Sequence, residues 1–172
     1  AEALLREVGD ITRDCIHGVE RIAAIVRELR TFARGDADRQ ETLRVETVVA
    51  EACRMVRAEL AYRARLVVQG APPPSVRGDR TKLVQVLTNL LLNAAHAIPE
   101  GDADRHEITV ATFTRGETVV VRVSDTGVGI APDVRSRIFE PFFTTKPRET
   151  GLGLGLPISA DILRRHGGQL RL

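Results

Sequence analysis

The chain has 172 residues, of which 43% are hydrophobic and 28% are charged, and its formal net charge at pH 7 is +2. This length allows one or two buried cores, and the composition is that of a soluble globular protein. The small net charge gives no electrostatic argument for binding nucleic acid or an anionic membrane surface, and the few aromatic residues exclude a base-stacking platform.

The same sequence shows neither a signal peptide nor an apolar run of about 18 residues. Its two cysteines, Cys15 and Cys53, lack the spacing of metal ligands and fit a reducing compartment. We therefore expect a cytoplasmic chain with no nucleic-acid partner and no direct membrane contact, although a longer parent protein could carry an anchor upstream of residue 1.

The first predicted element is a helix over residues 3–34. Apolar residues recur every seven positions in two interleaved rows, and a third row widens the stripe toward that of a helical bundle. The two rows are formed by Leu4, Val8, Ile11, Cys15, Ile22, Ile25, Leu29 and Phe32. Amphipathic helices usually pack within their own domain. Here the polar segment RGDADRQ at 34–40 separates the helix from the rest of the chain, so we predict a homodimer through helix 3–34.

From about residue 43 the pattern predicts a mixture of helices and strands. A helix over 46–60 is followed by a strand over 65–69 and by a GAPPPS loop. Asp79 has the character of an N-cap for a helix that runs to Ile98. Two strands with alternating character, 107–113 and 118–124, are joined by TRGE and predict a hairpin.

The last part of the chain predicts a turn at DTGVGI, a short helix near 132–138, the loop EPFFTTKPRET, and a glycine-led helix that ends at His166. The final GQLRL is expected to begin a strand. The predicted fold is an α/β sandwich, a mixed β-sheet with one layer of helices, preceded by a long helix of a dimerisation bundle. We place a truncated dimerisation part at 1–38 and an α/β domain, lacking its last strands, at 39–172.

The predicted helix after Asp79 contains NLLLNAAHAI, which places Asn89 and Asn93 one turn apart on one face, with His96 near the next turn. An asparagine carbonyl oxygen is a hard ligand that suits Mg²⁺, which completes its coordination with phosphates and water. Buried asparagines on an apolar helix more often serve packing and backbone hydrogen bonding. This pattern alone leaves both interpretations open.

The segment SDTGVGI follows an apolar strand, so Asp125 is predicted to lie at the end of a sheet, and Gly127 and Gly129 leave room for a flat ring. A carboxylate only accepts hydrogen bonds, so it matches the exocyclic amine of adenine and is repelled by the O6 atom of guanine. The alternative is an ordinary Asp-Thr-Gly turn after a strand.

The segment GLGLGLP places Gly151, Gly153 and Gly155 directly before a predicted helix. Free backbone N–H groups and the positive helix end can bind phosphate oxygens there. Pro157 is tolerated in the first turn because its missing N–H would have had no partner within the helix. A glycine-rich connector is the alternative, and the combination with the two preceding motifs favours nucleotide binding.

Together these motifs resemble the ATP-binding domain of the superfamily shared by sensor histidine kinases, gyrase-type topoisomerases, the ninety-kilodalton heat-shock chaperones and MutL. NLLLNAA is similar to the N box of that family, DTGVGI to its G1 box, FEPFFTTK to its F box and GLGLGL to its G2 box, in the family's order. The F box and PISADILRRHGG are most similar to histidine kinases of a nitrogen-regulation-sensor-like branch. The resemblance covers roughly residues 40–172, and residues 3–34 resemble the second helix of that family's dimerisation domain.

The resemblance implies roles for individual residues. Asp125 would bind the adenine amine and Asn93 would ligate Mg²⁺. Asn89 and Lys146 are implied as catalytic: Asn89 would support Asn93, and Lys146 would reach the γ-phosphate from a short lid. His96 stands where relatives often carry a Lys or Arg that faces phosphate. Further implied contacts with Mg·ATP are Gly127, Gly129, Ile130, Phe139, Phe143, Thr144, Thr145, Gly151, Leu152, Gly153, Leu154 and Gly155, and Phe142 would help Phe139 and Phe143 to anchor the lid.

As a function, the resemblance implies a histidine protein kinase, with ATP and Mg²⁺ as cofactors and a response regulator receiver domain as partner. Asn89 stands where hydrolytic relatives carry a glutamate that activates water, so ATP hydrolysis is expected to be slow. None of the four histidines lies in the phosphoacceptor pattern His-Glu-x-x-x-Pro, so the chain is expected not to phosphorylate itself. Two alternatives stay open: an anti-sigma-factor-type serine kinase, and a nucleotide-binding dimerisation or regulatory module without transferase activity.

Overall fold

The computed structural model describes Thr12, residues 40–146 and residues 151–172. The chain divides into two units, Ala1–Ala37 and Asp38–Leu172. Apart from Thr12, the predicted helix over 3–34 lies outside the described residues, and the predicted homodimer contact lies there with it. All the other described residues belong to the second unit.

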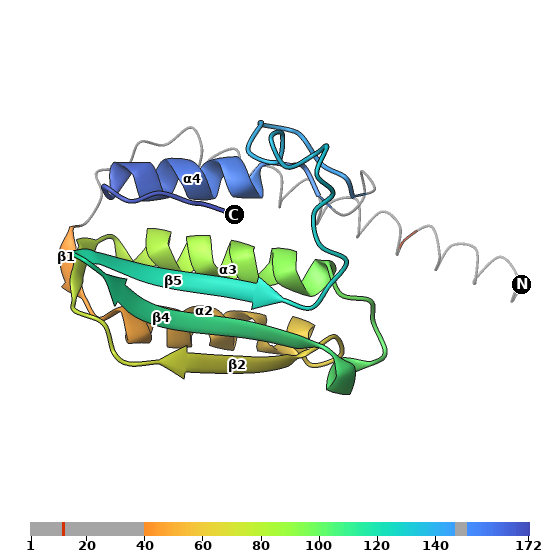
Figure 1. The fold of residues 1–172 in the computed structure, drawn as a ribbon, viewed down its shortest axis with the longest axis horizontal. Helices are drawn as coiled ribbons and strands as arrows, with labels where there is room; N and C mark the ends of the chain where they lie inside the picture. Colours follow the sequence, from red (N-terminus) through yellow and green to blue (C-terminus); the bar gives the residue numbers. More distant parts are fainter. Residues whose placement is uncertain (1–11, 13–39, 147–150) are drawn as a thin grey trace, which may run out of the picture. The chain divides into compact units, whose positions relative to one another are not determined.

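A mixed sheet forms one layer of this unit (Figure 1). Its strands, in the order β2-β4-β5, are β2 Arg65–Gly70, β4 Glu107–Arg115 and β5 Thr118–Asp125. β2 runs parallel to β4, and β4 runs antiparallel to β5. The predicted hairpin is confirmed: Gly116, with φ at 60°, lies in its turn, and Asp125 is the last residue of β5.

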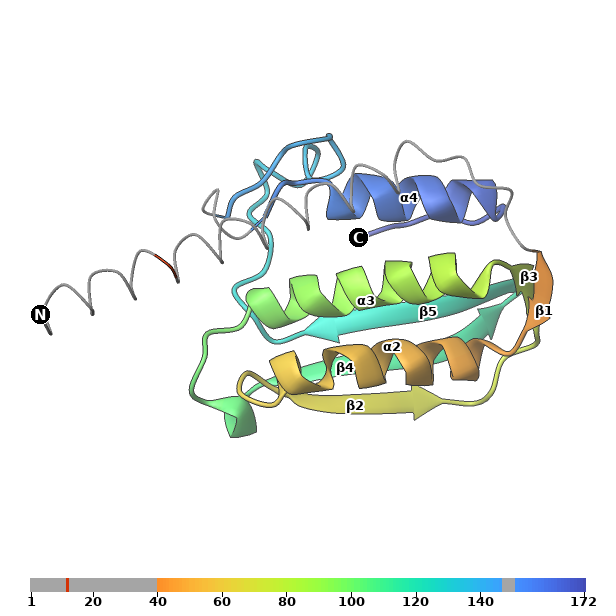
Figure 2. The same cartoon turned by 180° about the vertical axis from the view of Figure 1, so that it is seen from behind.

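Helices form the second layer on one face of the sheet (Figure 2). They are α2 Val45–Leu60, α3 Arg80–His96 and α4 Gly155–Arg165, and a short 3-10 turn, η1 Ala103–Arg105, precedes β4. α3 contacts both α2 and α4. It begins where predicted, because the Asp79 side chain accepts a hydrogen bond from the backbone N–H of Lys82 at 3.0 Å. The predicted mixed sheet with one layer of helices is confirmed.

The main core lies between the sheet, α2 and α3. Alternate residues of β4 are buried, among them Ile108 and Val110, as expected for a strand covered on one face. α2 contributes an apolar stripe at helical spacing, formed by Val45, Val48, Val49, Ala52, Val56 and Leu60. A second cluster joins α3 to α4 through Val86, Leu154, Ile158 and Ile162. Burial of each Val, Leu or Ile side chain contributes roughly 1.5–3 kcal/mol, so the two clusters hold α3 firmly between its neighbours.

Two predictions for the fold were wrong and one was incomplete. Residues near 132–138 form a series of turns and no helix, because the N–H groups of Val134, Arg137 and Glu140 each bond three residues back. The segment GQLRL forms no strand, because no strand of the described residues pairs with it. The pair β1 Glu41–Leu43 and β3 Val76–Gly78 was missed, because three residues are too few to show an alternating pattern.

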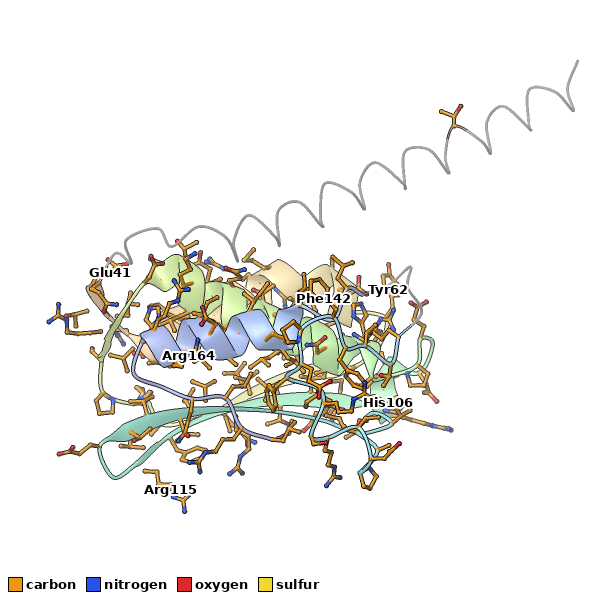
Figure 3. All side chains as sticks on the ribbon, turned by 90° about the horizontal axis from the view of Figure 1, so that it is seen from above. Glu41, Tyr62, His106, Arg115, Phe142 and Arg164 are labelled. Carbon is orange, nitrogen blue, oxygen red and sulfur yellow. The ribbon has the colours of Figure 1, made fainter. Side chains whose placement is uncertain are left out.

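The later ends of α2, α3 and β5 lie at one end of the unit (Figure 1). Figure 3 places Tyr62, which follows α2, His106, which precedes β4, and Phe142 toward this end. Glu41 and Arg115 lie toward the opposite end. Along the described parts of the chain, none of the helices has the length and apolar composition needed to cross a membrane.

Candidate functional site

The loop after β5 is fixed against the end of α3. Asp125 Oδ1 accepts a hydrogen bond from the Gly127 backbone N–H at 2.9 Å, and the Val128 N–H donates to the Ala97 carbonyl oxygen at 3.0 Å. A Cβ atom on Gly127 would lie 2.4 Å from that oxygen, so the close approach requires glycine. Asp125 is exposed, and its Oδ2 has no hydrogen-bond partner among the described residues. This oxygen can accept a hydrogen bond from the amine of a ligand.

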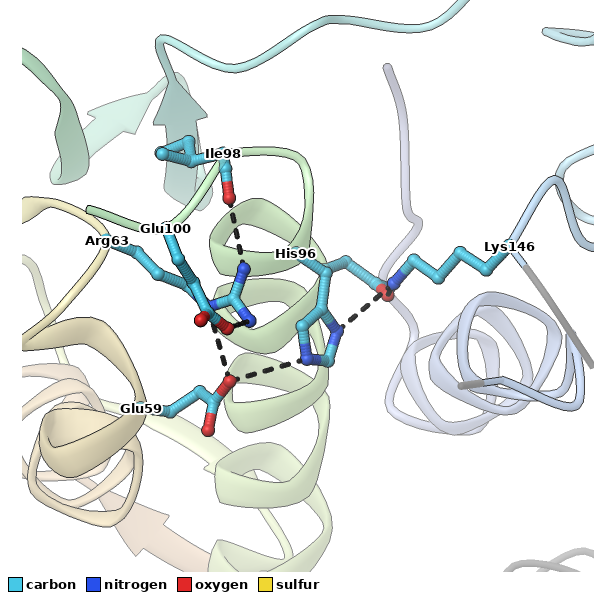
Figure 4. A network of polar contacts seen from close by, with 7 residues as sticks. Glu59, Arg63, His96, Ile98, Glu100 and Lys146 are labelled. Carbon is cyan, nitrogen blue, oxygen red and sulfur yellow. Dashed lines mark hydrogen bonds and ion pairs between the residues drawn. The ribbon is translucent and has the colours of Figure 1, made fainter. Parts of the chain in front are cut away.

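A second part of the site lies at the last turns of α3 (Figure 4). Lys146 Nζ lies 3.3 Å from Asn93 Oδ1 and 3.2 Å from His96 Nδ1. Because an ammonium group only donates, both atoms accept hydrogen bonds from it. His96 is followed directly by Ala97, which holds the Asp125 loop. The structure therefore brings together three residues predicted from two motifs, Asn93 and His96 from one and Lys146 from the other, and joins them to Asp125 through α3.

Burial and charge set the protonation of this group. Burial lowers the pKa of Lys146, and the Arg63 guanidinium lowers it further. The pKa of His96 is lowered by burial, then by the Lys146 ammonium and by Arg63, while the Glu59 carboxylate acts in the opposite direction. His96 is therefore neutral at pH 7, as its acceptance of a hydrogen bond at Nδ1 requires. Its proton is then on Nε2, which faces Glu59 Oε1 at 3.6 Å.

The Asn93 side chain presents its carbonyl oxygen to a cation, the Lys146 ammonium. Within the described residues, no cluster of three or more His, Cys, Asp or Glu could hold a metal ion. Mg²⁺ at nucleotide sites commonly takes most of its ligands from phosphate and water. Asn93 fits such an ion, because its Oδ1 already faces a positive group, the Lys146 ammonium.

The glycine-rich segment packs closely on its surroundings. Gly153 has φ at +68°, its carbonyl oxygen accepts from the Phe142 N–H at 3.1 Å, and a Cβ there would lie 2.3 Å from the Phe143 carbonyl oxygen. α4 begins at Gly155, where a Cβ would lie 2.3 Å from Asn89 Oδ1. These close contacts leave no room for a side chain at Gly153 or Gly155, so packing explains why both residues are glycine. Phosphate binding by this segment stays a prediction.

Asn89 joins α3 to α4. Its Nδ2 donates to Ser159 Oγ at 2.9 Å, and Ser159 is only 2% exposed. This bond satisfies a buried hydroxyl and fixes the second turn of α4 against α3. The role of Asn89 in supporting a metal-bound Asn93 stays a prediction beside this packing role.

The other predicted contacts differ in how accessible they are. Leu154 is buried between α3 and α4, so a nucleotide could contact only its backbone. The Arg137 guanidinium lies 4.3 Å from the centre of the Phe143 ring. Phe142, by contrast, is 66% exposed and therefore contributes little to anchoring the lid. Thr144 Oγ1 accepts from the Lys146 N–H at 3.1 Å. Of the rest, Ile130, Phe139, Gly151 and Leu152 are half-buried, and Gly129 and Thr145 are exposed.

Sequence reasoning missed Glu59 and Arg63. Arg63 forms ion pairs with Glu59 and Glu100 and donates to the Ile98 carbonyl oxygen at 3.1 Å. The spacing of Glu59 and Arg63 was the available signal, but the same spacing is typical of an exposed helical pair. Their approach to His96 depends on how α2 packs against α3.

The sequence of this chain is similar to a protein-family model and to several sensor proteins. A family model described as "Histidine kinase-, DNA gyrase B-, and HSP90-like ATPase" matches residues 78–172. The C4-dicarboxylate transport sensor protein DctB of Rhizobium meliloti (strain 1021) is 39% identical over 89% of this chain and 24% of its own length. The sensory histidine kinase/phosphatase NtrB of Azospirillum brasilense is 32% identical over 92% of this chain and 42% of its own length.

Solved structures agree with these sequence relatives. The mycobacterial sensor histidine kinase MprB is similar with a TM-score of 0.60 at 28% identity, over 74% of this chain and 80% of that structure. This chain spans about a quarter of the length of the DctB proteins that it matches, 24% of the one from Rhizobium meliloti and 27% of the one from Pseudomonas aeruginosa.

Proposed function

Because the chain belongs to the histidine kinase-, DNA gyrase B- and HSP90-like ATPase family, as an ATP-binding domain of the sensor histidine kinase type, we propose that it is the catalytic portion of a two-component sensor kinase. It binds Mg·ATP and donates the γ-phosphate to a histidine outside this chain, from which the phosphate passes to an aspartate of a response regulator. The observation that carries the proposal is the convergence of Asn93, His96 and Lys146 beside the loop of Asp125.

Each part of the site has a task in nucleotide binding. Asp125 accepts a hydrogen bond from the exocyclic amine and selects adenine over guanine. Asn93 would hold Mg²⁺, which would supply positive charge to neutralise the phosphates. Lys146 faces the γ-phosphate, and the backbone N–H groups before α4 meet phosphate oxygens.

The transfer itself is mainly positioning and charge neutralisation. The bond between the γ-phosphorus and the oxygen of the leaving ADP breaks, a phosphorus–nitrogen bond to the acceptor imidazole forms, and the N–H proton of the phosphorylated imidazole passes to solvent water. Lys146 stabilises the negative charge that the phosphate oxygens carry during this step. Asn89 is an amide and cannot take a proton from water, so the γ-phosphate is kept for the protein acceptor.

The chain does not phosphorylate itself. Of its histidines, His96 contacts Lys146, His106 Nδ1 lies 3.0 Å from Thr126 Oγ1, and His166 Nε2 accepts from the Asp79 N–H at 2.9 Å. His17 lies outside the described residues. None lies in the acceptor pattern, so incubation with Mg·ATP should add no phosphoryl mass of about 80 Da. We propose further that the predicted helix over 3–34 supplies the homodimer contact of a cytoplasmic kinase region.

Transfer in trans tests the proposal. The chain is mixed with a full-length kinase of this family that carries its acceptor histidine but a disabled nucleotide site, and terminally labelled Mg·ATP is added. We expect an acid-labile label to appear on the full-length partner. The label should be lost when this chain carries Asp125→Asn and should be kept when it carries the exposed control Asp104→Asn. Nucleotide binding without any transfer would leave a regulatory module as the function.

A further inference from the structure

A polar chain runs from the end of α2 to Lys146 (Figure 4). Arg63 Nε lies 3.4 Å from Glu59 Oε1, the same Glu59 oxygen lies 3.6 Å from His96 Nε2, and His96 Nδ1 lies 3.2 Å from Lys146 Nζ. Arg63 is a fixed starting point, because its side chain is only 16% exposed and donates to the Ile98 carbonyl oxygen. The ion pair with Arg63 therefore holds the Glu59 carboxylate next to the His96 imidazole.

The groups that face its two ring nitrogens determine the state of His96. Lys146 only donates, so Nδ1 is the acceptor and the neutral ring carries its proton on Nε2. Nε2 faces Glu59, which as a carboxylate only accepts. A carboxylate behind a histidine fixes both the tautomer and the orientation of the ring. Glu59 thus favours the one form of His96 that can hold Lys146.

Lys146 occupies the place of a cation at Asn93. Its ammonium lies on Asn93 Oδ1, the atom that Mg²⁺ requires in the proposed function. Two cations on one carbonyl oxygen repel each other strongly inside a protein. The entry of Mg²⁺ therefore requires Lys146 to leave Asn93. The contacts that link Lys146 through His96 to Glu59 oppose this movement of the lysine.

Resting on the proposed function, we propose that Glu59 is a positioning residue of the nucleotide site: acting through His96, it holds Lys146 on Asn93 until a Mg-bound nucleotide displaces the ammonium group toward the phosphates. Lys146 is then a placeholder cation in the nucleotide-free chain. This role gives an α2 residue control over a lysine 87 positions later in the sequence.

Side-chain NMR relaxation tests this role directly. The chain has two lysines, Lys82 and Lys146, so isotope-labelled lysine gives two ε-methylene signals, with Lys82 as the internal reference. Lys82 Nζ makes no hydrogen bond or ion pair within the described residues. In the nucleotide-free chain the Lys146 ε-methylene group should therefore be more ordered than that of Lys82.

Variants at Glu59 have a matched control on the same helix. Glu59→Ala should remove at least half of the difference in order between the two lysines, and Glu59→Gln, which keeps an acceptor for the His96 N–H, should retain most of it. Glu51→Ala, which removes an α2 partner of Arg80 at 2.7 Å, should change nothing. Wild-type order of Lys146 in Glu59→Ala would overturn the proposal.

A double variant shows whether Glu59 acts through His96. Glu59→Ala combined with His96→Ala should leave Lys146 as mobile as His96→Ala alone, because the two changes break one chain of contacts. Additive loss of order would contradict the proposal. These measurements need no nucleotide and so do not depend on the proposed function. Addition of Mg·ADP should then shift the Lys146 signal and leave Lys82 unchanged. Bound nucleotide with an unmoved Lys146 would refute the displacement, whereas no binding at all would refute the proposed function.

Discussion

Replacement of Gly127 by alanine tests how the loop of Asp125 is held against α3. The added Cβ would lie 2.4 Å from the Ala97 carbonyl oxygen and 2.7 Å from its carbon, so the oxygen is about 1 Å closer than the 3.4 Å of ordinary contact. Both are backbone atoms and cannot rotate away, so the loop must move. Overpacking costs about 1–3 kcal/mol, and loss of the Val128 to Ala97 hydrogen bond about 1 kcal/mol. We expect the free energy of unfolding to fall by about 2–4 kcal/mol.

Urea denaturation followed by circular dichroism measures this change, and Gly129→Ala is the matched control. Gly129 has φ at +71° with nothing within 4 Å of a built Cβ, so its substitution carries a conformational cost without a clash. That cost is about 1 kcal/mol. Equal destabilisation by the two substitutions, or a Gly127→Ala chain as stable as wild type, would refute the reasoning.

Three further predictions concern α3 and the lid lysine. Asn89→Ala should lower the free energy of unfolding by about 1–3 kcal/mol, because the Ser159 hydroxyl, 2% exposed, loses its donor; an unchanged urea midpoint would contradict this. The pKa of His96 is lowered in the folded chain from its ordinary 6.5, so the unfolded chain binds more protons as pH falls through this value. The contribution of His96 to the free energy of unfolding is therefore fully present above pH 6.5, and it is lost as the pH falls toward the lower pKa of the folded chain. Thermal unfolding between about pH 8 and about pH 5 should show a smaller decline in His96→Gln than in wild type. Lys146→Met should weaken ATP binding about tenfold or more in calorimetry, and ADP binding less, because the charge faces the γ-phosphate; equal losses would contradict that placement.

Local chemistry decided the features that the sequence predicted well. Asp79 caps α3 because its own side chain reaches an N–H three residues later, and Asp125 ends β5 because turn residues follow an apolar alternation. Both depend on neighbours in sequence and need no knowledge of packing. The same is true of the Gly116 turn.

Tertiary contacts decided what sequence reasoning missed. Glu59 reaches His96 only because α2 and α3 pack side by side. The sequence suggested that Gly127 leaves room for a ligand, whereas the structure shows that the room is needed for the backbone of Ala97. The segment near 132–138 has residues that a helix tolerates, but its hydrogen bonds span three residues. Periodicity alone cannot distinguish such turns from a short helix.

Calorimetric titration with Mg·ADP and then Mg·GDP, on wild type, Asp125→Asn and the control Asp104→Asn, tests the central claim that this site binds an adenine nucleotide. The account predicts binding of Mg·ADP over Mg·GDP in wild type and Asp104→Asn. In Asp125→Asn it predicts a loss of about tenfold or more in affinity for Mg·ADP, the effect of one hydrogen bond to a charged group. Failure of a folded wild-type chain to bind Mg·ADP, or undiminished binding by Asp125→Asn, would contradict it.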